Sequence, residues 1–219
     1  MPIRAILFDL DGTLIDQFEA IHRAFARVLT QMGYPEPSYE KVKSSVGGAS
    51  LSTMTKLIGP ERAHEAVEIL RPIFEEEMLL GLKALPGSHE ILSFCRRRGI
   101  KAAVLTNKHG PHARAACDHL LFSEWLSFTL GADETELKKP DPRLTMLALE
   151  KLGGHTHDTL YLGDSPYDYE TATQAGLKSI LVATGTHSEA ELKAIAPNCV
   201  HSNLKEVMLE VLPVLIENE

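Results

Sequence analysis

Short apolar runs recur along this chain, and each one leads into polar residues. The runs cover residues 3–8, 101–106, 127–130, 159–162 and 179–183. Their length and composition are typical of buried β-strands, and helical patterns lie between them. Residues 88–98, for example, place three apolar side chains on one helical face: Ile91, Leu92 and Cys95. The alternation of strands and helices predicts an α/β core in which helices cover both faces of a parallel sheet.

The segment of residues 16–85 breaks this alternation. Its first apolar residues stand at helical spacing: Phe18, Ile21, Phe25 and Val28. Two or three more helices follow, and Pro72 is expected to kink or split the last one. We expect no strand in this segment. The simplest account is a discontinuous core of residues 1–15 and 86–219 with an all-helical insert of residues 16–85 after the first strand.

Composition narrows the classes of partner. The formal net charge is 22 − 30 = −8, so general nucleic-acid binding is not expected, and an anionic substrate needs local positive groups or a metal cation. No stretch approaches the roughly 18 apolar residues of a membrane span, and a carboxylate at position 9 argues against a signal peptide. Three scattered cysteines fit a reducing cytoplasm better than a disulfide framework.

The sequence DLDGTL at residues 9–14 follows the first apolar run. Ligands sit at the carboxyl ends of strands in an open parallel sheet, so Asp9 is expected to face that crevice. The geometry of Asp11 is left open, because Gly12 indicates a sharp turn. Two carboxylates this close ionise together at low cost only with a cation between them, and Mg²⁺ prefers oxygen ligands. Taken alone, the same residues are equally typical of a turn after a strand.

Polar residues of matching chemistry follow the other strands. Thr106 can donate its hydroxyl to a phosphate oxygen, and Lys138 and Lys139 precede a proline at a helix start. Asp164 and Asp168 share a face if a helix begins between them. Each has an ordinary explanation alone, as a cap, a solvated lysine pair or first-turn acids. Together they place acids, a hydroxyl and a lysine in one crevice, as phosphoryl transfer requires.

In this order, the motifs resemble those of the haloacid dehalogenase-like phosphatase superfamily over nearly the whole chain. They are DLDGTL, the strand-end Thr106, Lys139 before proline, and GDSPYD at residues 163–168. The resemblance implies a Rossmann-like core with the helical insert as a cap domain. It also implies a magnesium-dependent phosphatase that acts on a small phosphorylated metabolite, in the cytoplasm, as a monomer or homodimer.

The resemblance also assigns roles to the acids. Asp9 resembles the nucleophile that becomes an aspartyl-phosphate, and Asp11 the general acid that later activates water as a base. Mg²⁺ would be held by the carboxylates of Asp9 and Asp164 and by the backbone carbonyl of Asp11. Asp168 would support it, either as a direct ligand or through the residues that bind it.

Phosphate-binding and substrate-binding roles follow in the same way. Thr106 and Lys139 would bind the phosphoryl oxygens, with Asn107 contributing through its backbone or its amide. Lys138 is the alternative to Lys139, but the lysine-proline context favours Lys139. In the cap, a loop of residues 46–50 that contains Gly47 and Gly48 is expected to lower onto the site and help select the substrate. A plain linker between helices explains this loop equally well.

Within the superfamily the chain looks most like phosphoglycolate phosphatases, although pyrophosphatases and sugar phosphatases share much of the pattern. A dehalogenase would lack the second acid of the first motif, and Asp11 is present. A mutase of the β-phosphoglucomutase type would carry a cap histidine where this chain has Ile21, with His22 one residue later. A non-catalytic protein on the same scaffold would lack one of the motif residues, and none is missing. A metal site built from four residues of one probable helix has no recognised ligand spacing: His109, His112, Cys117 and His119.

Overall fold

The computed structural model describes residues 2–46 and 48–217 and contains a six-stranded parallel sheet in the order β5-β4-β1-β6-β7-β8. The strands are β1 Ala5–Phe8, β4 Lys101–Leu105, β5 Thr129–Leu130, β6 Thr159–Gly163, β7 Lys178–Val182 and β8 Val200–His201. Every neighbouring pair is parallel. The predicted α/β class with a Rossmann-like core is confirmed. The edge strand β8 was not predicted, because two residues are too few to show a strand pattern.

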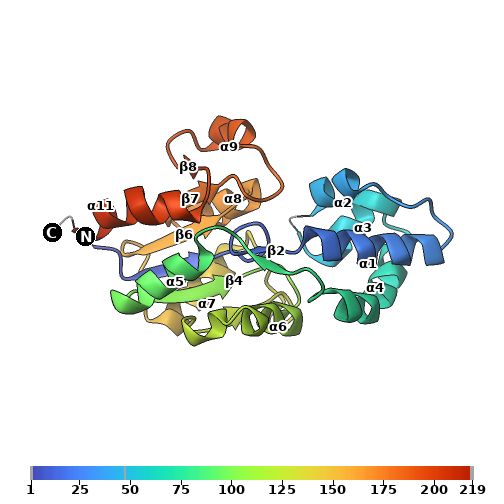
Figure 1. Ribbon diagram of the computed structural model, residues 1–219, viewed down its shortest axis with the longest axis horizontal. Helices are drawn as coiled ribbons and strands as arrows, with labels where there is room; N and C mark the ends of the chain where they lie inside the picture. Colours follow the sequence, from blue (N-terminus) through green and yellow to red (C-terminus); the bar gives the residue numbers. More distant parts are fainter. Residues whose placement is uncertain (1, 47, 218–219) are drawn as a thin grey trace.

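Helices cover both faces of this sheet (Figure 1). They are α5 Ser88–Arg97, α6 Gly110–His119, α7 Pro142–Leu152, α8 Pro166–Gln174, α9 Glu189–Ile195, α10 Leu204–Glu206 and α11 Leu212–Glu217, with short turns η1 Phe122–Glu124 and η2 Val207–Val211. One apolar cluster joins α5, α6 and the C-terminal helices to one face, and another joins α7 and α8 to the other. Because β1 alternates between the two clusters, it lies buried at the centre, and its carboxyl end is fixed from both sides.

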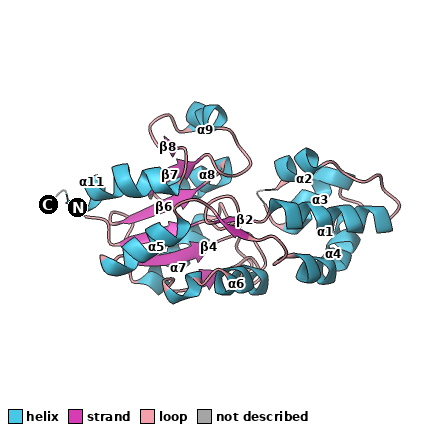
Figure 2. Cartoon of the chain, in the orientation of Figure 1, coloured by secondary structure: helices cyan, strands magenta, loops and turns pink. Residues whose placement is uncertain are grey.

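The helical insert forms a separate unit beside the core, drawn apart from the sheet in Figure 2. Its helices are α1 Phe18–Gln31, α2 Tyr39–Ser45, α3 Ser50–Ile58 and α4 Ala63–Glu77. They enclose their own apolar cluster, in which α1 packs on α4. We call this unit the cap. Its separate cluster supports the division of the chain at residues 15/16 and 85/86, which stays a prediction.

One expectation for the insert is wrong, and another is wrong in part. The segment does contain strand, because β2 Ile15–Asp16 and β3 Lys83–Ala84 pair antiparallel where the chain leaves and re-enters the core. Two-residue strands are too short to show a period-2 pattern, so the sequence gives no signal of them. Of the two outcomes expected at Pro72, a split is excluded because α4 continues to Glu77, and a kink stays a prediction. Pro72 and Glu68 are both exposed, so water can satisfy the carbonyl that loses its donor.

Two findings bear on partners and cysteine chemistry. In the described part of the chain, no helix has both the length and the apolar composition needed to cross a bilayer. The cysteines are free thiols: Cys95 and Cys117 are buried in the core, and Cys199 is half-buried. Burial raises the pKa of Cys95 to about 12 and that of Cys117 to about 11, so neither thiol supplies a nucleophile at neutral pH.

Candidate active site

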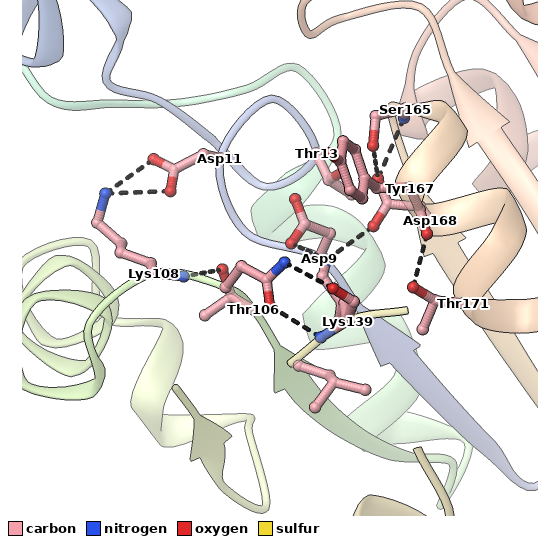
Figure 3. A network of polar contacts seen from close by, with 12 residues as sticks. Asp9, Asp11, Thr13, Thr106, Lys108, Lys139, Ser165, Tyr167, Asp168 and Thr171 are labelled. Atoms are coloured by element: carbon pink, nitrogen blue, oxygen red, sulfur yellow. Dashed lines mark hydrogen bonds and ion pairs between the residues drawn. The ribbon is translucent and has the colours of Figure 1, made fainter. Parts of the chain in front are cut away.

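The predicted site residues of the core converge at the carboxyl ends of the parallel strands (Figure 3). Asp9 directly follows β1 and still donates its backbone N–H to Leu162 of β6 at 2.8 Å, so the strand holds its backbone. Thr106 follows β4 and Asp164 follows β6, and both are buried. Parallel strands bring these positions together from segments more than 50 residues apart in sequence, which explains why one short motif could not define the site.

Lys139 lies at the centre of the site with a buried side chain. Its Nζ donates to Asp9 Oδ1 at 2.6 Å, to Asp168 Oδ1 at 2.8 Å and to the Tyr161 hydroxyl at 3.1 Å. The Asn107 amide fixes the lysine backbone, since it accepts from Lys139 N at 2.9 Å and donates to Lys139 O at 3.1 Å. The Asn107 side chain therefore positions Lys139.

The two lysines of the predicted pair have different roles. Lys138 Nζ donates to backbone carbonyls of its own loop, to Ala132 O and, at 2.8 Å, to Thr135 O. Its ammonium is thereby turned into the loop that precedes α7, while Lys139 faces Asp9. The structure thus places Lys139 in the site and leaves Lys138 outside it.

Asp168 has every side of its carboxylate occupied. Oδ1 accepts from Lys139 and from Tyr161, and Oδ2 accepts from Asp164 N at 3.2 Å, Ser165 N at 3.1 Å and Ser165 Oγ at 2.5 Å. The bonds to residue 165 form a capping box at the start of α8. Asp168 therefore fixes both Lys139 and the turn that carries Asp164.

Asp164 sits in a narrow cradle between two backbone segments. Its Oδ1 accepts from the Thr13 hydroxyl at 3.1 Å. A Cβ on Gly185 would lie 1.6 Å from its Oδ2, and a Cβ on Gly12 would lie 2.6 Å from the same atom. Only glycine leaves room for the carboxylate at these two positions, and Gly12 also has a φ of +89°, which glycine adopts without strain.

Three carboxylates of this site lie close enough to share a cation. One oxygen each from Asp9, Asp164 and Asp168 lies within 4.8 Å of the other two, and within the described residues this is the one group of three or more such side chains. With Lys139 the formal charge is 1 − 3 = −2. A divalent cation brings that sum to zero, and an all-oxygen donor set suits Mg²⁺.

The electrostatics agree with this charge count. Burial raises the pKa of Asp9 to about 7, although Lys139 acts to lower it. Burial also raises the pKa of Asp164 far above its usual value, with a further contribution from Asp168 and Asp9. Burial acts to lower the pKa of Lys139, but Asp168 and Asp9 hold it well above its usual range. The carboxylates therefore resist ionisation together unless a cation is added.

Asp11 points away from this cluster and meets a residue that the sequence did not single out. Lys108 Nζ donates to Asp11 Oδ1 at 3.1 Å and to Oδ2 at 3.0 Å. The same ammonium lies 4.9 Å from the ring centroid of Phe74 on cap helix α4. Lys108 thus connects the predicted general acid to the cap.

A pocket of about 140 Å³ lies between core and cap at this point. Its floor is the cluster just described, and Thr186 from the loop after β7 joins it. Three residues of the predicted cap loop line it: Val46, Gly48 and Ser50. Gly47 lies outside the described residues. The loop therefore borders the place where the rest of a substrate would sit.

Other residues considered above lie elsewhere. His22 turns outward, where its Nε2 lies 3.0 Å from Pro37 O, while Ile21 lines the pocket. His109 and His112 also line the pocket, with ring centroids 4.5 Å apart, but Cys117 is buried in the core cluster. These helix residues form no metal group in the described part of the chain.

Sequence reasoning missed several residues that complete the site. Tyr161 lies inside an apolar strand, and its hydroxyl role depends on a lysine 22 residues away. Ser165 and Thr13 stand within recognised motifs, at positions whose hydroxyls were not assigned. Lys108 was visible as a cation two residues after Thr106, at the same strand end as Asn107. That placement was the available signal, because side chains just past a strand end face the crevice.

Comparisons with known proteins agree with this geometry. A family model described as haloacid dehalogenase-like hydrolase matches residues 6–182. The phosphoglycolate phosphatase of Aquifex aeolicus is 32% identical over 84% of this chain and 86% of its own length. The phosphoglycolate phosphatase of Yersinia pestis is 29% identical over 99% of this chain and 97% of its own length. A haloacid dehalogenase-like hydrolase from Streptococcus pneumoniae shares the fold, with a TM-score of 0.84 at 23% identity over 94% of this chain and 97% of that one.

Proposed function

We propose that this chain, which belongs to the haloacid dehalogenase-like hydrolase family and is a phosphatase, hydrolyses a small phosphomonoester through an aspartyl-phosphate on Asp9. The names of the two phosphoglycolate phosphatases support phosphoglycolate, or a compound like it, as the substrate. We further propose that the reaction needs Mg²⁺ and that the protein works in the cytoplasm as a monomer or homodimer.

One observation carries this proposal. At the floor of the pocket, Lys139 joins Asp9 to Asp168 within a buried cluster of formal charge 1 − 3 = −2. A structural ion pair would balance its charges, whereas this cluster keeps an excess of carboxylate. The excess supports a site that is completed by a divalent cation and an anionic phosphoryl group.

Mg²⁺ fits these donors. The carboxylates of Asp9 and Asp164 and the backbone carbonyl of Asp11 would hold it, while Asp168 keeps Asp164 and Lys139 in place through its five hydrogen bonds. When bound, Mg²⁺ offsets the negative charge of the phosphoryl oxygens and the carboxylates.

The first step forms the aspartyl-phosphate. An Asp9 carboxylate oxygen attacks phosphorus, and the bond from phosphorus to the leaving oxygen breaks as Asp11 donates a proton to that oxygen. Lys139 and the Thr106 hydroxyl stabilise the phosphoryl oxygens. In the structure both carboxylate oxygens of Asp11 accept from Lys108 Nζ, so this contact must open for Asp11 to reach the leaving oxygen.

The second step regenerates the enzyme. Asp11, now ionised, accepts a proton from a water molecule as the water oxygen attacks phosphorus. The bond between phosphorus and Asp9 breaks, which releases inorganic phosphate and returns Asp9 as a carboxylate. One residue thus serves as acid and then as base.

The mutase alternative has less support. His22 binds the Pro37 carbonyl, and the pocket-lining position beside it is an isoleucine. A mutase must hold a sugar phosphate in two orientations, and no histidine of α1 reaches the pocket within the described residues. Product analysis separates the two: a phosphatase releases inorganic phosphate from a sugar phosphate, and a mutase returns an isomer.

A substrate screen with phosphopeptide mapping tests the proposal. Phosphate release is measured from phosphoglycolate, pyrophosphate, glucose 6-phosphate and AMP, with Mg²⁺ and with excess chelator. We expect the highest kcat/KM with phosphoglycolate, no turnover under chelation, and recovery on adding Mg²⁺. Acid quenching followed by mass spectrometry should place a phosphoryl group on the peptide that contains Asp9. Turnover that persists under excess chelator, or a phosphoryl group on another residue, would refute the mechanism.

A further inference from the structure

The cap wall of the pocket carries one unmatched charge. Helix α4 turns four residues toward the pocket at i, i+3, i+4 and i+7 spacing: Val67, Leu70, Arg71 and Phe74. Helix α1 adds Ile21 and Phe25 to the lining. Five of these six side chains are apolar, and Arg71 is the exception.

Arg71 differs from the other arginines of the cap. Arg23, Arg27 and Arg62 each bind a glutamate side chain of the cap, at 2.8, 2.8 and 2.9 Å. Arg71 has no hydrogen bond and no ion pair with any described residue, although glutamates are abundant on α4. Glu75, one turn further along, binds His112 of the core at 3.3 Å instead.

The surroundings give this free guanidinium a function. An arginine binds a carboxylate or a phosphate through two parallel hydrogen bonds. Arg71 is an exposed residue that also lines the pocket, so an incoming ligand can reach its guanidinium. The phosphoryl end of the pocket already has Lys139 and the carboxylate cluster to hold it. A chain of net charge −8 repels anions in general, so the one charged side chain that the described cap residues bring to this pocket favours a second negative group beside the cap wall.

We propose that Arg71 binds a second oxyanion, carried on the leaving group of the substrate, and thereby sets the substrate class of this phosphatase. This inference rests on the proposed function and extends it to a residue that the motifs do not include. The substrate is then a phosphomonoester whose leaving alcohol bears a carboxylate or a second phosphate. A neutral alcohol of the same size leaves the guanidinium unpaired.

Three substrates of similar size separate these cases: phosphoglycolate, ethylene glycol bisphosphate and ethyl phosphate. The variant is Arg71→Met, which keeps the apolar stem and the helix but removes the charge. Charge-assisted hydrogen bonds contribute about 1.5–3 kcal/mol, so kcat/KM for the anionic substrate should fall roughly 10- to 100-fold relative to ethyl phosphate, mostly through KM. Arg71→Lys should recover part of the lost preference for the anionic substrate over ethyl phosphate. Selective loss with phosphoglycolate identifies a carboxylate, and selective loss with the bisphosphate identifies a second phosphate.

The matched control is Arg62→Met, which removes a cap arginine that pairs with Glu65 outside the pocket. This variant should leave the ratio of kcat/KM values between the anionic substrates and ethyl phosphate unchanged. Calorimetric binding of phosphoglycolate and of ethylene glycol bisphosphate to Asp9→Asn and to Asp9→Asn/Arg71→Met tests the same contact without turnover. Equal losses for all three substrates, or the same affinities with and without Arg71, would overturn the inference. Absence of phosphate release from every substrate would instead reject the proposed function, and the binding comparison would still decide the role of Arg71.

Discussion

The core and the cap treat polar groups in opposite ways. At the floor of the pocket, Asp168 accepts five hydrogen bonds and Lys139 donates three, all from buried positions. At the roof, the cap presents an apolar wall, and the other cap arginines pair with glutamates outside the pocket. At the pocket, the core therefore holds Lys139 and Asp168 through several partners each, whereas Arg71, the one charged side chain of the cap wall, forms no hydrogen bond or ion pair with any described residue.

This difference indicates how the work is divided. Side chains held by several bonds keep their geometry while charge develops, which favours the chemical step. A wall of apolar side chains and one free cation contacts the substrate mainly through shape and charge, which favours binding. We therefore expect core variants to change kcat and cap variants to change KM. The predictions below test that division, beginning with the largest expected effect.

Removing the proposed nucleophile should abolish turnover. Asp9→Asn replaces the attacking oxygen with an amide that is a poor nucleophile, so kcat should fall by about 10⁴-fold or more, the scale on which a lost nucleophile acts. Asp141→Asn is the matched control, because an asparagine can cap α7 as the aspartate does. Circular dichroism should show both variants folded. Turnover of Asp9→Asn near that of the control would end the assignment.

Removing Asp11, the proposed general acid, should have a smaller effect that depends on the leaving group. Asp11→Asn should lower kcat by roughly 10²–10⁴-fold with an alkyl phosphate, the usual range for general acid–base catalysis. With p-nitrophenyl phosphate the leaving oxygen needs no proton, so stopped-flow should still show a burst of p-nitrophenol before slow turnover. If Asp11→Asn slows formation of the aspartyl-phosphate equally with both substrates, Asp11 does not act as the general acid.

The positioning network should appear as weaker metal binding. Asp168→Asn lacks one acceptor oxygen for the N-terminus of α8 and the negative charge that pairs with Lys139. Residues that orient metal ligands typically contribute 10- to 100-fold in affinity, so the Mg²⁺ concentration for half-maximal activity should rise by about that factor. Asp164→Asn should raise it further. The same Mg²⁺ dependence in Asp168→Asn as in the wild type would contradict the network.

The unbalanced carboxylates should also make stability depend on pH. The pKa of Asp9 rises from 3.8 to about 7 on folding, so between these values the folded state binds more protons than the unfolded state. Stability contributed by this proton is present at low pH and is lost as pH rises toward 7. In the presence of chelator, raising the pH from 5 to 7.5 should therefore lower the Tm of the wild type relative to the Tm of Asp9→Asn. Mg²⁺ should remove the shift, and a difference that does not change with pH would contradict the charge count.

The difference between core and cap also explains which site residues could be predicted from the sequence. Candidate residues of the core follow strand ends, and strand ends are visible as apolar runs. The sequence therefore predicts that Asp9, Thr106 and Asp164 meet, and the fold brings them together. The proline that follows Lys139 was the only signal that favoured it over Lys138. By contrast, the role of Tyr161 depends on a contact across the sheet, which no local pattern reports.

The cap was less predictable for a physical reason. Its helices were visible from their spacing, but β2 and β3 are too short to show a period, and their pairing joins residues far apart in the chain. Which face of α4 meets the core is set by packing between two units. The pocket position of Arg71 therefore could not be derived from a helical pattern in which Val67, Leu70 and Phe74 serve equally as cap core.

The smallest effect is expected from the cap loop. A Cβ on Gly48 would lie 3.0 Å from Ser52 Cβ and Oγ, so Gly48→Ala must shift the loop by a few tenths of an ångström at the pocket rim. No hydrogen bond or ion pair joins the described loop residues, 46 and 48–50, to a residue proposed for the chemical step. KM should therefore rise by less than about tenfold, or about 1.4 kcal/mol, with kcat nearly unchanged. Steady-state kinetics with phosphoglycolate and ethyl phosphate measure both parameters, and Ser44→Ala on the exposed face of α2 is the control. A fall in kcat without a change in KM would show that the cap takes part in the chemistry, and the division between core and cap would then fail at this loop.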